Sequence, residues 1–337
     1  MKLNINSQPL QIVLIILSAI LLTWMSVTVQ VNSMNKKYLR VREINYHDRV
    51  IQGQAGNPYQ YRVLGSYYAY NIVQGMRALG FPGPQINGFI LARYLQNFIL
   101  FLLAAFYYRK LGLNVIASLL GVSMLAWGMT LSLYDSYLSY DTYFDIIFYL
   151  LAGLIILNQK YYWLIPVMIM AAFNRETGGL IPFMLLAYYF INRLKHPSRK
   201  TILGYFGILL AIYVAVFFSL RWYYGEQQFI TAYGHYPGIN LIVYNVTRTI
   251  TWENLVGTLG IVPILALLVY DKWPTSLKGF FWVVVPAWFL IHIIAAILAE
   301  SRLVLVPQAL IFIPGALFCT RLNGDTKANL AHRGNES

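Results

Sequence analysis

The residues that could do chemistry begin in one polar segment, residues 32–85, which lies between two strongly apolar stretches. Within it, Asp48 stands in the string Tyr46-His47-Asp48-Arg49. A carboxylate on a loop held against a membrane can act as a general base toward a hydroxyl group. The alternative is a solvated loop acid that pairs with Arg49. Both interpretations of Asp48 stay open.

Two further strings each join an acid and an arginine where apolar stretches meet. They are Asn174-Arg175-Glu176-Thr177 and Glu300-Ser301-Arg302. An arginine can hold a phosphate through two parallel hydrogen bonds while a neighbouring carboxylate orients it. The alternative is an ion pair that closes a helix end. Because the pattern occurs twice, it favours a phosphate site at these junctions.

Three aspartates, Asp135, Asp141 and Asp145, cluster between two apolar stretches. Asp141 and Asp145 are four residues apart, so they share one face of a helix. Like charges this close raise one pKa or attract a cation. No known metal-ligand spacing accompanies them, so we predict no cofactor, and a divalent metal at these aspartates stays open as the alternative. A structural or hydrogen-bonding role is favoured.

Arg93 and His292 fall inside apolar stretches. Ionisable groups at membrane depth are costly and usually face a cavity or one another. Arg93 either extends to the outer surface or faces a cavity that holds a phosphate. For His292, a role in packing is favoured.

The composition places all of these residues in a membrane protein. Of 337 residues, 58% are hydrophobic and 11% are charged, whereas a soluble domain has about 25% charged residues. The net charge of +13 fits basic loops at an anionic cytoplasmic surface and does not require nucleic acid as a partner. The single cysteine, Cys319, excludes a disulfide framework. The sequence contains no phosphate-loop or dinucleotide-binding motif.

The hydropathy pattern predicts an all-α, polytopic membrane helix bundle with about ten transmembrane helices. The predicted spans are 10–31, 86–107, 114–133, 141–157, 161–173, 179–191, 201–222, 254–270, 279–298 and 302–319. Alternate connections are basic, which predicts that both termini are cytoplasmic and that residues 32–85 are outside. Apolar residues at helical spacing within 61–79 predict an interfacial helix in that loop. The chain is then one membrane domain, 1–337, with a tail at 320–337.

This layout resembles the GT-C superfamily of integral membrane glycosyltransferases, as represented by bacterial members. The resemblance is carried by Pro58-Tyr59-Gln60-Tyr61-Arg62-Val63-Leu64, Asn174-Arg175-Glu176-Thr177 and Glu300-Ser301-Arg302. The resemblance implies a donor sugar carried on a polyprenyl phosphate. It also implies that an acidic residue in the first outer loop acts as the general base, and that the sugar carbon is inverted. It makes Asp48 the catalytic base. It also makes Arg62, Arg175 and Arg302 ligands of the leaving phosphate, and it extends that role to Arg93.

We therefore predict a glycosyltransferase of a bacterial inner membrane that uses a polyprenyl-phosphate sugar and acts on an envelope or surface glycan or lipid. The predicted substrate-binding residues are Arg62, Arg93, Arg175, Glu176, Glu300, Arg302, Asp135 and Asp141. Two alternatives stay open: a transporter or flippase of lipid-linked sugars, and a polysaccharide polymerase or assembly subunit. A flippase should need polar residues along a path to the cytoplasm, and the inner halves of the predicted spans are poor in them.

Overall fold

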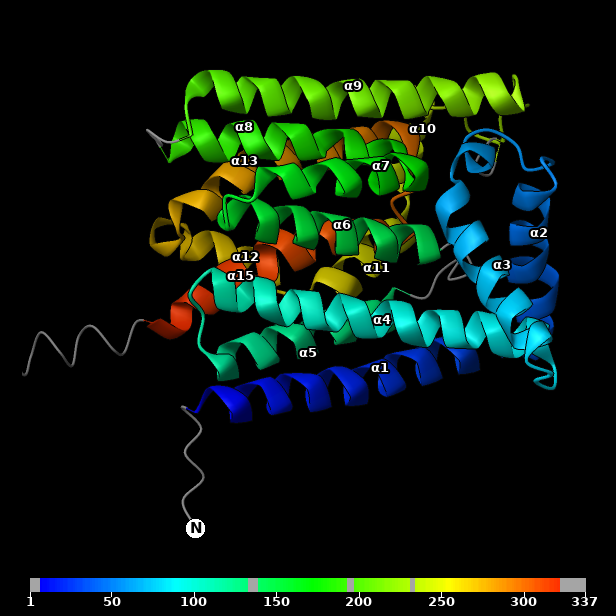
Figure 1. Ribbon diagram of the computed structural model, residues 1–337, viewed down its shortest axis with the longest axis horizontal. Helices are drawn as coiled ribbons and strands as arrows, with labels where there is room; N and C mark the ends of the chain where they lie inside the picture. Colours follow the sequence, from blue (N-terminus) through cyan, green and yellow to red (C-terminus); the bar gives the residue numbers. More distant parts are fainter. Residues whose placement is uncertain (1–6, 133–138, 193–196, 231–233, 322–337) are drawn as a thin grey trace, which may run out of the picture.

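The computed structural model describes residues 7–132, 139–192, 197–230 and 234–321 (Figure 1). Across these ranges the secondary structure is helical, apart from one isolated β-bridge between Asn57 and Phe229. The predicted all-α class is therefore confirmed. The helices are α1 (Gln8–Tyr38), α2 (Asn45–Ile51), α3 (Val63–Ala78), α4 (Pro84–Lys110), α5 (Val115–Leu131), α6 (Ser139–Leu157), α7 (Leu164–Asn174), α8 (Ile181–Ile191), α9 (Arg199–Tyr224), α10 (Ile239–Thr247), α11 (Thr249–Leu259), α12 (Val262–Leu268), α13 (Thr275–Ala295), α14 (Leu305–Pro307) and α15 (Ile313–Leu317).

Six helical segments in the described ranges are long and apolar enough to cross a membrane, as expected of a membrane protein. They are Gln8–Ser33, Pro84–Lys110, Tyr140–Leu157, Arg199–Tyr224, Thr275–Ala295 and Ser301–Thr320. The pair α11 and α12, bent by 62°, adds a seventh if both lie in one span.

Each predicted span overlaps helical structure, with the span at 254–270 divided between α11 and α12. The predicted count of about ten crossings is not confirmed. The remaining apolar helices, which include α5, α7 and α8, are shorter than the six. The 11 residues of α7 extend only about 16 Å, against about 30 Å for the hydrocarbon core of a bilayer. By length, these shorter helices are therefore not counted among the membrane-spanning segments.

The long helices lie side by side, and α2 and α3 cross one end of the bundle (Figure 1). The helix α3 coincides closely with the interfacial helix predicted at 61–79. It buries Ser66, Ala69 and Val73 on one face, while Tyr67 and Tyr70 on another face are exposed. At the opposite end of the bundle α1 begins and α15 ends.

A buried ion pair fixes the first polar segment to the bundle. Glu43, in the π-helical turn Leu39–Ile44, accepts a hydrogen bond of 2.5 Å from Nη2 of Arg93 on α4. Both side chains are fully buried. Burial raises the pKa of Glu43 to about 6, and the charge of Arg93 opposes that rise. This ion pair therefore connects the turn Leu39–Ile44 to α4.

Candidate functional site

A cavity of about 450 Å³ lies where the segment before α3 meets the ends of α7, α9 and α13. Its polar lining includes Tyr59, Arg62, Arg175, Glu176, Thr177, Tyr213, Arg221, His235, His292, Glu300 and Arg302. Its apolar lining includes Phe229, Ile230, Leu241, Ile291, Ala295 and Leu303. Five of the predicted substrate-binding residues are therefore brought together: Arg62, Arg175, Glu176, Glu300 and Arg302.

Side-chain hydrogen bonds hold the segment that precedes α3. Nε2 of Gln60 donates to the carbonyl oxygen of Val50 at 2.9 Å, and the backbone N–H of Ala55 donates to Oε1 of Gln60 at 2.8 Å. The Tyr61 hydroxyl donates to the carbonyl oxygen of Gly225 at 2.9 Å. Arg62 follows at once, at the start of α3. These contacts explain how the motif around Pro58 fixes an arginine at the cavity.

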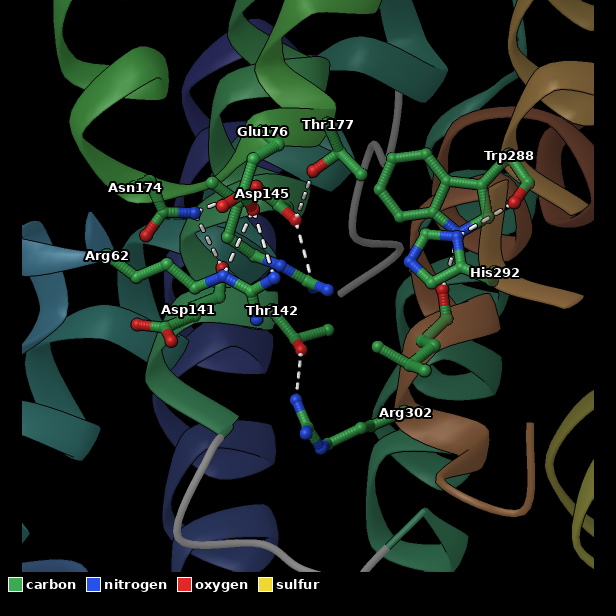
Figure 2. A network of polar contacts seen from close by, with 12 residues as sticks. Arg62, Asp141, Thr142, Asp145, Asn174, Glu176, Thr177, Trp288, His292 and Arg302 are labelled. Atoms are coloured by element: carbon green, nitrogen blue, oxygen red, sulfur yellow. Dashed lines mark hydrogen bonds and ion pairs between the residues drawn. The ribbon is translucent and has the colours of Figure 1, made fainter. Parts of the chain in front are cut away.

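Arg62 forms an ion pair with Glu176 through two of its guanidinium nitrogens. Its Nε and Nη2 atoms donate to Oε2 of Glu176 at 3.1 and 3.0 Å (Figure 2). Nη2 of Arg221 lies 3.8 Å from Oε1 of the same glutamate. Burial lowers the pKa of Arg62, but Glu176 and Asp141 raise it more, so the net shift is upward. Arg62 therefore stays charged.

The turn between α7 and α8 positions Arg175. A Cβ atom at Gly178 would lie 3.0 Å from a backbone oxygen of α7, so this tight return favours glycine. Nη1 of Arg175 lies 3.2 Å from Oδ2 of Asp145. Asn174 donates to Oδ1 of Asp145 at 2.8 Å, and Thr177 donates to Oδ2 at 3.0 Å (Figure 2). Asp145 thus orients Arg175 through a fully bonded carboxylate.

Arg302 enters the cavity from the 3-10 turn Ser301–Val304 that follows α13. Its Nη1 atom donates to Oγ1 of Thr142 at 2.7 Å (Figure 2), and its Nη2 atom forms an ion pair with Glu300. Both Arg302 and Arg175 are only about 5% exposed at the side chain. Their positions are therefore set by bonded partners rather than by solvent.

The cavity lining favours an anion. It carries four arginines and two glutamates, a formal charge of +2 with its histidines neutral. A guanidinium has five N–H donors. Within the described part of the chain, Nη1 of Arg62 and Nη2 of Arg175 have no hydrogen-bond partner. Beside these donors lies the apolar lining, so the arrangement can hold a phosphate attached to a hydrocarbon chain.

Three of the other predicted residues, Arg93, Asp141 and Asp48, do not line this cavity. Arg93 pairs with Glu43, as described above. Asp141 is buried, and the Tyr46 hydroxyl donates to its Oδ2 atom at 3.4 Å. Asp48 lines a different, smaller cavity. Asp135 lies outside the described residues.

Sequence reasoning did not single out Arg221 and Tyr213. Arg221 lies in the last turn of α9, where a basic residue is ordinarily read as an interfacial anchor. Its guanidinium lies over the Tyr61 ring at 4.4 Å, and the Tyr213 hydroxyl donates to the carbonyl oxygen of Glu176 at 3.0 Å. Neither contact has a sequence signal, because the partners are more than thirty residues away.

His292 combines packing with access to the cavity. Its ring stacks on Trp288 with centroids 4.7 Å apart, in keeping with the packing role favoured from the sequence. Its Nδ1 atom lies 2.8 Å from the Trp288 carbonyl oxygen. A carbonyl only accepts, so Nδ1 donates.

Across the described ranges, no group of three or more His, Cys, Asp or Glu side chains is placed to hold a metal ion.

Comparisons with known proteins found no relative. The chain matches no protein-family model, and neither a curated protein nor a solved structure matches it. The cavity is therefore interpreted from its own residues.

Proposed function

We propose that the protein is a membrane glycosyltransferase that takes a sugar from a polyprenyl-phosphate donor. The observation that carries this proposal is the cavity in which Arg62, Arg175, Arg221 and Arg302 lie beside an apolar wall. The arginines suit the phosphate, and the wall suits the lipid chain. Fixed positive groups stabilise the negative charge that develops on a departing phosphate.

In the proposed reaction, the oxygen of an acceptor hydroxyl attacks the anomeric carbon of the donor sugar. The bond between that carbon and the phosphate oxygen breaks, and the polyprenyl phosphate leaves with the bonding electrons. The hydroxyl proton passes to a carboxylate. Atoms and charges balance without a further co-reactant.

We assign the proton-accepting role to Glu300, because Asp48 lies in the other cavity. Both oxygens of Glu176 face arginines, Oε2 toward Arg62 and Oε1 toward Arg221. Glu300 has an ion pair at Oε2 only, and Oε1 has no bonded partner among the residues that the structure describes. An oxygen without a bonded arginine is the better acceptor for a hydroxyl proton.

We further propose that the cavity opens at the outer face of a bacterial inner membrane, with both termini in the cytoplasm. Arg109 and Lys110 end α4, and this end of α4 lies at the opposite end of the bundle from α2 and α3 (Figure 1). Basic residues favour the cytoplasmic side. The acceptor is then a glycan or lipid of the envelope or cell surface.

The test is sugar transfer by the purified protein in sealed lipid vesicles. Radiolabelled polyprenyl-phosphate sugars are supplied with envelope extract as acceptor, and labelled product is measured. Transfer with release of polyprenyl phosphate supports the proposal. Absence of transfer with every donor overturns it, and movement of the labelled lipid across the bilayer would then identify a flippase. Use of a polyprenyl diphosphate donor alone would identify a polymerase.

A further inference from the structure

A second cavity, of about 160 Å³, lies between α2, α3 and the start of α4. Its lining is rich in polar side chains that the proposed reaction does not use, among them His47, Asp48, Ser66, Gln74, Arg77 and Gln85. Phe89 and Tyr70 contribute aromatic surface. The cavity therefore combines hydrogen-bonding groups with aromatic rings.

The inner wall contains a buried imidazole with an unused nitrogen. His47 is 1% exposed, and its Nδ1 atom lies 2.8 Å from the Ser66 hydroxyl. Its Nε2 atom is buried and has no hydrogen-bond partner in the described structure. Burial, with the nearby charge of Arg93, lowers the pKa of His47 to about 3, so the ring is neutral. Because a hydroxyl both donates and accepts, Ser66 leaves Nε2 able to accept or donate.

The outer part of the cavity carries the charged groups. Asp48 is partly buried, and in the described ranges its carboxylate forms no hydrogen bond and no ion pair within 4.0 Å. Arg77 lines the same cavity, so the two formal charges cancel. The side-chain amides of Gln52, Gln74 and Gln85 each offer donors and an acceptor. A cavity without net charge that presents many paired donors and acceptors suits a neutral ligand with several hydroxyl groups.

We propose that this cavity binds one sugar residue of the acceptor glycan. That the sugar belongs to the acceptor rests on the proposed function, but recognition of a neutral sugar rests on the cavity alone. Asp48 and Gln74 bind hydroxyl groups, Nε2 of His47 binds one further hydroxyl at the inner wall, and Tyr70 covers one face of the ring. Asp48 is thus a binding residue for the acceptor and not the base.

The test measures binding of methyl hexopyranosides to the full-length protein in lipid nanodiscs, without any donor. Saturation transfer from protein to sugar is recorded by NMR. We expect signal with the wild type and a loss of at least about tenfold in apparent affinity for Asp48→Asn and Gln74→Ala. Arg49→Ala, an exposed arginine on the same segment, and Arg62→Ala, in the larger cavity, should keep wild-type binding.

Two results would overturn the proposal. One is that no methyl glycoside gives a signal sensitive to Asp48→Asn or Gln74→Ala. The other is that glycerol phosphate, a lipid headgroup, binds in place of the sugars and that this binding is lost in Arg77→Ala. Since no donor is present, failure of sugar transfer would refute the proposed function without changing this result.

Discussion

At the residue scale, removing the charge of each cavity glutamate is expected to change a different kinetic constant. Glu300→Gln takes away the proposed proton acceptor, so kcat should fall by about 10²–10⁴-fold. Donor binding should be kept, because Arg302 still has its hydrogen bond to Thr142. Glu176→Gln frees Arg62 and Arg221 from the carboxylate that orients them, so donor KM should rise. Steady-state transfer kinetics of both variants measure the difference. Normal kcat in Glu300→Gln would move the base elsewhere.

His47 predicts a pH dependence of stability. Its pKa in the folded protein is about 3, below the ordinary value of about 6.5, so the unfolded chain binds more protons between these values. Stability is therefore full above pH 6.5 and falls as the pH drops, by up to about 1.4 kcal/mol per pH unit. Glu43 acts in the opposite sense below pH 6, because burial raises its pKa.

Comparison with His47→Gln separates the two residues. The free energy of unfolding is measured in detergent at pH 7 and at pH 5. Its decrease from pH 7 to pH 5 should be larger for the wild type than for the variant. An equal loss in both proteins would mean that His47 titrates normally in the folded protein.

At the scale of elements, the contact of α3 with α6 depends on Gly65. A Cβ atom there would lie 2.7 Å from Oδ1 of Asp141 and 3.2 Å from Cβ of Tyr140. We expect Gly65→Ala to destabilise the protein by about 1–3 kcal/mol, because α3 must shift away from α6. Gly75 on the same helix has open space around its Cβ position. Gly75→Ala should therefore stabilise by about 0.5–1 kcal/mol.

Thermal unfolding of both glycine variants measures the contrast. If Gly65→Ala were as stable as Gly75→Ala, the close approach of α3 to α6 would be wrong.

The elements were predictable from the sequence to different degrees. Apolar runs and helical spacing located the long helices and the helix α3, because those patterns are local. The pairing of Arg62 with Glu176 joins residues 114 apart in the chain, and no local pattern encodes it. The same limit explains Asp48: its polar segment was identifiable, but the packing of α2 against α3 decides which cavity it lines.

At the scale of the whole molecule, the proposed orientation can be tested with single cysteines. After Cys319→Ser, a membrane-impermeant maleimide should label Gln54→Cys in intact cells, because Gln54 is exposed on the segment proposed to lie outside. Lys110→Cys, exposed at the end of α4, should be labelled only after the membrane is opened. Labelling of Lys110→Cys in intact cells would reverse the orientation.

The most direct test of the central claim compares sugar transfer from a polyprenyl-phosphate donor by the wild type, Arg62→Ala and Arg49→Ala. Arg62 supplies a charged donor to the cavity, whereas Arg49 is exposed and donates to the backbone oxygen of Gln54. We predict a fall in transfer rate of about 10²–10³-fold for Arg62→Ala and no change for Arg49→Ala. An equal rate in all three proteins would contradict a lipid-phosphate site in this cavity.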